Sequence, residues 1–165
     1  MINNKSVYSK IKSWFDSNHW KYSWNENDNI FTWAVSISND LEKKSGNNSE
    51  LHFLLDLKKD CYLIYAFSPI SVESKYQHAV LQLLNSINCQ MVFGAFEYND
   101  TAYEIRFKLY VDCLNQAPSS SIIERSILIP ANMFVLYGDV ISDVAHGRDD
   151  IDHALHLIHE IAIKR

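Results

Sequence analysis

The sequence predicts an α+β domain, in which an antiparallel β-sheet of about five to six strands has helices packed on one face. Three observations favour this fold. From Thr101 to Asp112, apolar and polar residues alternate, which is the pattern of a strand with one buried face. Four shorter stretches before residue 68 alternate in the same way. Between residues 72 and 88, apolar residues instead recur every three or four positions, as along one side of a helix.

The elements are expected in the order α-ββββ-α-ββ-α(α)-α. A first helix is indicated because Val7, Ile11 and Phe15 fall one turn apart. Pro69 is expected to end the fourth strand, and Ser71 to cap the helix that follows it. Along the chain we expect a helix at 5–16, strands at 20–24 and 31–37, a surface loop at 39–50, strands at 51–57 and 61–67, a helix at 72–88, the hairpin described next, and helices at 122–127, 130–146 and 151–161.

The hairpin between residues 91 and 112 is predicted to form the middle of the sheet. If Asn99-Asp100 is a two-residue turn, Phe96 lies opposite Tyr103 and the first strand extends back to Val92. This register places the apolar residues of both strands on one face, and a slip of one residue would destroy that arrangement.

Composition limits the classes of protein to be considered. With 165 residues, of which 47% are hydrophobic, we expect a single domain over residues 1–165. The net charge is −5, and the segment 139–160 carries six acidic residues against one Arg148. No basic patch is evident, so the sequence predicts neither a nucleic-acid surface nor attraction to an anionic membrane. Because no apolar run would serve as a signal peptide or span a bilayer, we expect a cytoplasmic protein.

The sequence also predicts no catalytic residue and no cofactor. It lacks a nucleophile motif and a glycine-rich phosphate loop, and Cys61, Cys89 and Cys113 have neither metal-ligand nor disulfide spacing.

Three histidines near the C-terminus could serve as metal ligands, namely His153, His156 and His159. Neighbouring pairs lie about one helical turn apart, but successive steps of three residues rotate by ~60° around a helix, so all three do not converge on one ion. A solvated polar face is the favoured interpretation. A small metal-binding protein or enzyme using this cluster is the alternative.

The strand pattern fails at one place, and that failure indicates an interaction surface. The strand at 61–67 is expected to bury Cys61, Leu63, Tyr65 and Phe67. Leu54, Tyr62 and Ile64 then fall on the sheet face opposite the helices, where a monomer normally carries polar side chains. We interpret these three residues as an apolar patch for a protein partner or for a second copy of the chain. The alternative is that a loop or the first helix covers them.

Two stretches, residues 83–112 and 140–161, resemble the YbjN-like bacterial proteins. The positions that carry the resemblance are Gly94, Phe96, Glu104, Arg106, Gly147, Ala154 and Leu155. It implies a fold similar to the chaperones of type III secretion systems, frequently dimeric, with no enzymatic activity and with regulatory or chaperone-like binding of other proteins.

These observations together favour a non-enzymatic protein-binding domain, chaperone-like or regulatory, that acts through an apolar sheet face. Its expected partners are another protein, a second copy of the chain, or both. A subunit that is stable only inside an oligomer is a further possibility.

Overall fold

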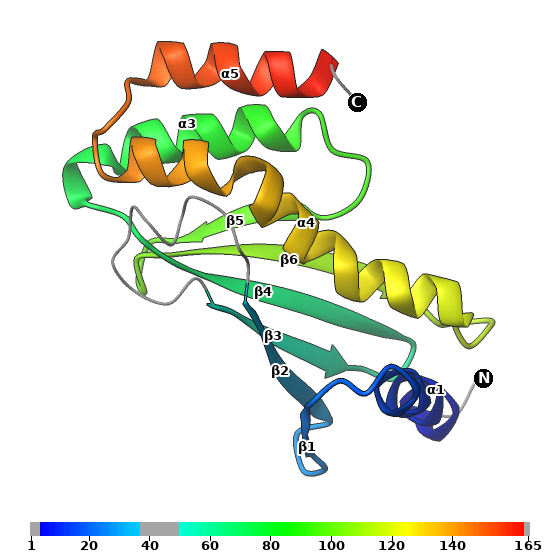
Figure 1. The fold of residues 1–165 in the computed structure, drawn as a ribbon. Coiled ribbons are helices and arrows are strands. Elements are labelled where there is room, and N and C mark those ends of the chain that lie inside the picture. Colours follow the sequence, from blue (N-terminus) through cyan, green and yellow to red (C-terminus); the bar gives the residue numbers. More distant parts are fainter. Residues whose placement is uncertain (1–3, 37–49, 164–165) are drawn as a thin grey trace.

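The computed structural model of the chain describes residues 4–36 and 50–163 (Figure 1). Its centre is a six-stranded antiparallel sheet with the strand order β1-β2-β3-β4-β6-β5. The strands are β1 (Ser23–Asn25), β2 (Ile30–Ser36), β3 (Glu50–Leu57), β4 (Cys61–Ser71), β5 (Ala95–Asn99) and β6 (Glu104–Asp112). The helices are α1 (Asn4–Ser17), α3 (Gln77–Asn88), α4 (Ser120–Ala145) and α5 (Ile151–Ile163), with the 3-10 turn η1 (Ser74–Tyr76) before α3. The predicted α+β class and element order are confirmed. The surface loop expected at 39–50 lies almost entirely outside the described residues.

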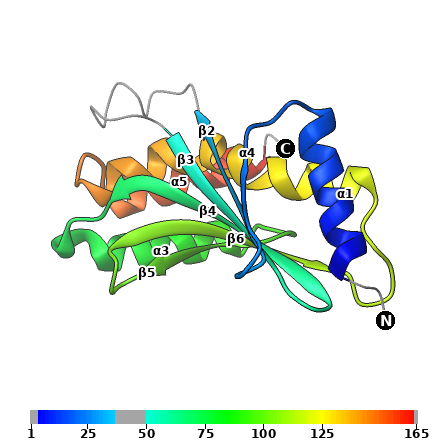
Figure 2. The same ribbon diagram turned by 90° about the horizontal axis from the view of Figure 1, so that it is seen from below.

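Helices α3, α4 and α5 lie on one side of the sheet (Figure 1). Seen from the other side, the strands lie in front of these three helices (Figure 2). We call this second side the open face. Helix α1 contacts α4, and the Lys10 ammonium donates to the Pro118 carbonyl at 3.2 Å just before α4 begins. The core therefore lies between the sheet and the helices.

An aromatic cluster joins α1 to the first strands. The Phe15 ring is fully buried, and its centroid lies 4.9 Å from that of Tyr22, 5.1 Å from that of Trp33 and 5.8 Å from that of Phe31. Rings at such separations add specific contacts to the large apolar area they bury. This cluster accounts for much of the aromatic content of the N-terminal part of the chain.

The predicted register of the β5–β6 hairpin is wrong by an even number of residues. Phe96 lies opposite Phe107, whereas Tyr103 belongs to the loop. The Asn99 side-chain oxygen accepts hydrogen bonds from two loop amides, those of Thr101 and Ala102, and this favours a longer turn. Because an even shift keeps side chains on their own face, the predicted buried face of the hairpin is nevertheless correct.

The predicted face of β4 is wrong because its pairing with β3 differs by one residue from the expected register. Leu57 pairs with Tyr62, and the Lys58 amide donates to the Cys61 carbonyl at 2.9 Å. The expected alternation instead places Cys61 on the same face as Leu57. A shift of one residue exchanges the two faces of a strand, so Tyr62 and Ile64 are buried and the alternate row faces outward.

Two proline predictions also need correction. Strand β4 continues past Pro69 to Ser71, with an irregular register after Phe67, so Ser71 is not a helix cap. Pro130 lies inside a single 26-residue helix, α4, and does not begin a new one. The helix changes direction near its middle, as expected of an internal proline (Figure 1).

No segment able to cross a membrane is expected from the sequence, but α4 is long and apolar enough to do so by length and composition. The core helix of a soluble protein meets the same criterion, so this is weak evidence for a span. Within the described fold, α4 packs against β4, β6 and the other three helices.

Candidate functional site: the β6–α4 groove

Two of the three patch residues expected on the open face are core residues. Tyr62 and Ile64 are fully buried, and the Tyr62 hydroxyl lies 2.9 Å from the Ser126 hydroxyl of α4. Burial raises the pKa of Tyr62, because the charged phenolate would lose its hydration. Their assignment to an exposed surface is therefore wrong. Leu54 does lie on the open face and is half-buried.

The apolar row on the open face of β4 consists of Leu63, Tyr65 and Phe67, which lie beside Leu54 of β3. Each of these side chains is half-buried. The Arg106 guanidinium lies 5.0 Å from the centroid of the Tyr65 ring and also contacts Glu97 at 2.8 Å. The Arg106 side chain therefore covers the middle of this row, which makes it a weaker candidate for a binding surface than its composition suggests.

Glu97 holds these charged side chains in place. Burial raises the pKa of its carboxyl group, but hydrogen bonds from Lys108 and Arg106 outweigh that effect and hold the pKa below its usual range. The Lys108 ammonium lies 3.0 Å from the second carboxylate oxygen of Glu97. The three residues form a polar cross-strand network on the open face.

A more exposed apolar region lies at the edge of the sheet, because β5 pairs with only part of β6. The pairing covers Glu104–Lys108, and within the described chain no strand lies beside the last four residues of β6 on that side. We call residues 109–112 the bare edge. The Cys113 amide donates to the Asp60 carbonyl at 2.8 Å, on the side facing β4. Since backbone groups alternate along an antiparallel strand, the N–H and C=O groups of Tyr110 and Asp112 point outward from the bare edge.

Gly94 explains why β5 begins only at Ala95 and does not extend along the bare edge. Its φ is +72°, and a Cβ at this position would lie 2.5 Å from a ring carbon of Phe107 and 2.7 Å from the Lys108 carbonyl oxygen. Glycine tolerates both the positive φ and the close approach. The chain before Gly94 therefore leaves the sheet, and Val92 and Phe93 become exposed.

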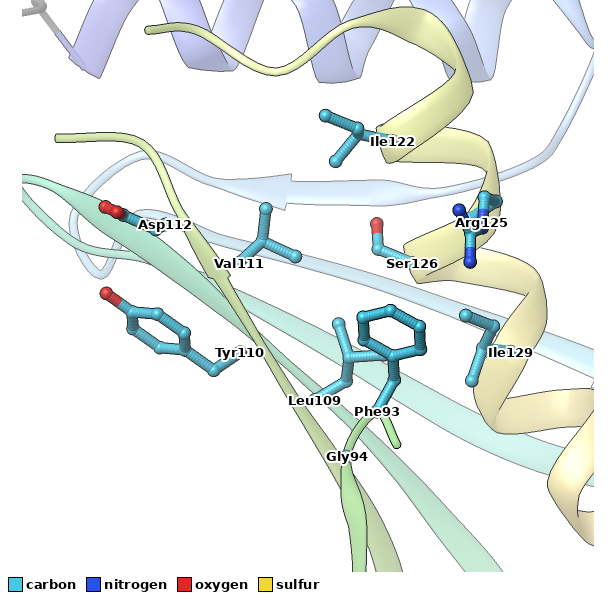
Figure 3. A pocket seen from close by; sticks show the side chains of 10 residues that line it. All are labelled: Phe93, Gly94, Leu109, Tyr110, Val111, Asp112, Ile122, Arg125, Ser126 and Ile129. Carbon is cyan, nitrogen blue, oxygen red and sulfur yellow. The ribbon is translucent and has the colours of Figure 1, made fainter. Parts of the chain in front are cut away.

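A cavity of about 290 Å³ lies between the bare edge and the first half of α4 (Figure 3). We call it the β6–α4 groove. Its lining residues are Phe93, Gly94, Leu109, Tyr110, Val111, Asp112, Ile122, Arg125, Ser126 and Ile129. Figure 3 shows Val111 on the side of the strand toward α4, whereas Tyr110 points away from the helix. The exposed fractions of Phe93, Tyr110 and Ile122 are 55%, 59% and 47%.

Arg125 is the cationic side chain of the groove. Its guanidinium lies 5.4 Å from the centroid of the Phe93 ring, and among the described residues it forms no ion pair. Asp112 supplies a carboxylate at the other end of the bare edge, where it accepts a hydrogen bond from the Leu114 amide at 2.9 Å. The groove thus offers apolar side chains, outward-facing backbone groups and an available cation.

Comparisons with known proteins support the fold. No family model matches the chain, and no curated protein matches it. Among solved structures, it is similar to the crystal structure of YbjN from E. coli, a proposed transcription regulator, with a TM-score of 0.53 and 12% identity over 82% of this chain and 85% of that one. The chain has a YbjN-like fold. At this identity the similarity extends to the fold alone, so the resemblance seen in the sequence is confirmed at that level.

The C-terminal histidines on the YbjN-like fold do not form a cluster. The His153 ring nitrogen lies 2.8 Å from the Asp149 carboxylate, and that of His156 lies 3.7 Å from Glu160. Across residues 4–36 and 50–163, no group of three or more His, Cys, Asp or Glu side chains could hold a metal ion. The geometry therefore does not favour the metal-binding alternative.

The groove was not predicted from the sequence. The structure shows that the first strand of the hairpin has five residues and the second has nine, which leaves part of the second strand without a partner in the hairpin. The one signal in the sequence was Phe93 directly before Gly94, an apolar ring beside a glycine where the chain turns away.

Proposed function

We propose that this protein is a non-enzymatic, chaperone-like or regulatory protein-binding domain, and that the β6–α4 groove is its binding site. The observation that carries the proposal is the bare edge, where outward-facing backbone groups adjoin exposed apolar side chains. The expected cytoplasmic location and the ability to form a homodimer are further parts of the same proposal.

The clustering of the exposed residues supports this assignment. Single exposed apolar side chains are normal on protein surfaces, but grouped ones mark interaction sites. Phe93, Tyr110 and Ile122 come from three separate segments and line one groove. Tyrosine and arginine, both present here, are also the residue types enriched among those that dominate binding energy.

The similarity to YbjN is consistent with a regulatory role, since that protein is a proposed transcription regulator. A regulator that lacks a basic surface of its own would act by binding other proteins. The chain described here has a net charge of −5, which supports a protein partner over a nucleic acid.

The test compares two substitutions on the same helix. Ile122→Asp places a charge in the groove, whereas Val135→Asp places one on another exposed position of α4, where the native side chain has an exposed fraction of 51%. Both chains are used for affinity capture from the native cell, with bound proteins identified by mass spectrometry. We expect Ile122→Asp to lose proteins that the wild type and Val135→Asp retain.

A third variant tests the open face. Leu63→Asp introduces a charge into the apolar row of β4, which the sequence analysis would have treated as core. If capture survives Ile122→Asp and is lost with Leu63→Asp, the open face is the binding surface and the groove assignment is wrong. Light scattering of all variants shows whether the lost partner is a second copy of the chain.

A further inference from the structure

The bare edge specifies the conformation of what it binds. Tyr110 and Asp112 direct their backbone N–H and C=O groups outward, and a helix or a folded surface does not satisfy such a row of alternating groups. An extended segment placed alongside satisfies them, as happens when peptides add a strand to an exposed sheet edge.

The two end strands of the sheet, β5 and β1, offer less to an added strand than the bare edge does. On β5, the Asn88 side chain accepts a hydrogen bond from the Phe96 amide at 2.8 Å and donates one to the Phe96 carbonyl at 2.9 Å. Asn88 thus occupies the outward backbone groups of Phe96, with which a further strand would otherwise pair. At the opposite end of the sheet, β1 has only three residues, and short edge strands offer little to pair with.

We propose that the β6–α4 groove binds an extended segment of a partner protein as an added strand, antiparallel to β6, with apolar residues facing α4 and an acidic side chain at Arg125. This inference rests on the proposed function and names the chemistry of the partner.

The direction of the segment follows from β5. The added strand would continue the line of β5 beyond Gly94, so it would run from the Asp112 end of the bare edge toward Phe93. Its alternate side chains would contact Leu109 and Val111 on one side, where Ile122 and Ile129 form the wall, and would face solvent beside Tyr110 on the other.

The charges of the groove specify the ends of the segment. The Arg125 guanidinium contacts the Phe93 ring and lacks an ion-pair partner within the described chain. A carboxylate brought beside it would form charge-assisted hydrogen bonds. Because Phe93 lies at the β5 end, the acidic residue follows the apolar residues in the partner's sequence. Asp112 disfavours a second acidic residue at the start of the segment.

The backbone pairing is tested with a pair of variants at one position. Tyr110→Pro removes the outward N–H and leaves pairing with β4 intact, because the hydrogen bonds to β4 come from the neighbouring residues. Tyr110→Thr removes the same ring but keeps the N–H and the preference for a strand. The comparison therefore separates the backbone group from the side chain.

The probe is a library of random twelve-residue peptides displayed on phage and selected on the full chain. We expect enriched sequences in which apolar residues alternate with polar ones and precede an acidic residue. Synthetic copies of these peptides should bind Tyr110→Pro at least tenfold more weakly than Tyr110→Thr. In the wild type, hydrogen exchange should show the Tyr110 amide protected only when a peptide is bound. The Leu109 amide should be protected in the free wild type and in Tyr110→Pro, which verifies that the variant is folded.

The acidic residue expected in the partner segment is tested separately. Arg125→Glu should weaken binding of the selected peptides at least tenfold, and Arg125→Lys should restore most of it. Selected peptides that lack an acidic residue and bind Arg125→Glu unchanged would remove this part of the proposal.

Other outcomes separate the strand from the site. Strand addition would be overturned if the selected peptides bound Tyr110→Pro and Tyr110→Thr with equal affinity, or if the enriched sequences had helical spacing. The groove would still be the binding site if Ile122→Asp abolished binding of the peptides. If Ile122→Asp has no effect either, the proposed function fails as well. A dimer of the free chain that Tyr110→Pro dissociates would show that the occupant is β6 of a second copy, and the foreign segment would be excluded.

Discussion

The two halves of β6 have the same pattern of buried side chains but opposite situations at their edge. In the first half, Glu104–Lys108 pair with β5, and Asn88 in turn covers the outer side of β5. In the second half, residues 109–112 pair with β4 and, within residues 4–36 and 50–163, with no other strand. Ile105 and Leu109 are both buried, so alternation along the strand does not reveal the difference.

The difference shows that the edge is set by the neighbouring segment rather than by the strand itself. Proteins commonly blunt a free edge with lysine, proline or a bulge. The bare edge has neither a lysine nor a proline, and its side chains on the open face are Tyr110 and Asp112. Gly94 creates the vacancy by turning the chain away, and α4 shelters one side of it. The experiments below test how far the two halves differ.

The largest effect is expected on the strand that both halves share. Ile64 of β4 lies opposite Leu109 and is fully buried, so Ile64→Asp places a carboxylate where it has no hydration and no partner. We expect this variant to be unfolded at 25 °C. Its neighbour Leu63 faces outward, so Leu63→Asp should remain folded. Circular dichroism and thermal unfolding of the two variants measure the difference.

This pair decides the face of β4. If Leu63→Asp unfolds and Ile64→Asp does not, the one-residue register difference described above would be reversed. The buried row would then be the one that the sequence pattern favours.

The next largest effect is expected in the covered half. Phe107 is fully buried, and its ring centroid lies 5.1 Å from that of Phe96 on β5. Phe107→Ala should lower the free energy of unfolding by about 3–5 kcal/mol, since it leaves a cavity in the core. Lys108→Ala removes a partly exposed ion pair with Glu97 and should cost less than about 1 kcal/mol. Denaturant unfolding of both variants measures the ratio, and equal losses would contradict the assigned faces.

Sequence patterns identified which face of most elements is buried, because side-chain alternation reports burial directly. Helix α1 and the hairpin face follow from such patterns. The errors arise at turns. Asn99 organises a four-residue loop, and the turn before β4 sets Leu57 opposite Tyr62 rather than Cys61. Turn length is set by local hydrogen bonds that composition does not specify.

The groove could not be predicted for a related reason. Its parts come from the segment before β5, the end of β6 and the start of α4, which only the tertiary fold brings together. Leu54 was correctly placed on the open face, but Tyr62 and Ile64 followed the wrong register. No periodicity in one segment shows that a neighbouring strand stops early.

A smaller effect on stability is expected when the Asn88 side chain, which bonds to the outer side of β5, is removed. Asn88→Ala deletes two hydrogen bonds to the Phe96 backbone, and at about 1 kcal/mol each the loss should be about 2 kcal/mol. The Phe96 amide should also exchange faster with solvent, as we expect of the Tyr110 amide in the free chain. Asn85→Ala, on an exposed position of the same helix, is the control and should change neither quantity by a measurable amount.

The smallest effect concerns the end of the bare edge and depends on pH. Cys113 is buried beside Asp112, and burial raises the pKa of its thiol from near 9 to about 11, with the charges of Cys61 and Asp112 adding to the effect. A raised pKa in the folded state means that stability is fully present below pH 9 and is lost as the pH rises toward 11. At pH 10 the loss should be about 1 kcal/mol, because one pH unit above the unfolded pKa corresponds to about 1.4 kcal/mol.

Denaturant unfolding of the wild type and of Cys113→Ala between pH 8 and 10 measures this loss of stability. Cys61→Ala is the control, because burial also raises the pKa of Cys61. The wild type should lose stability over this range more steeply than Cys113→Ala. Equal slopes would mean that the thiol reaches solvent, and the end of β6 would then be more open than the groove geometry requires.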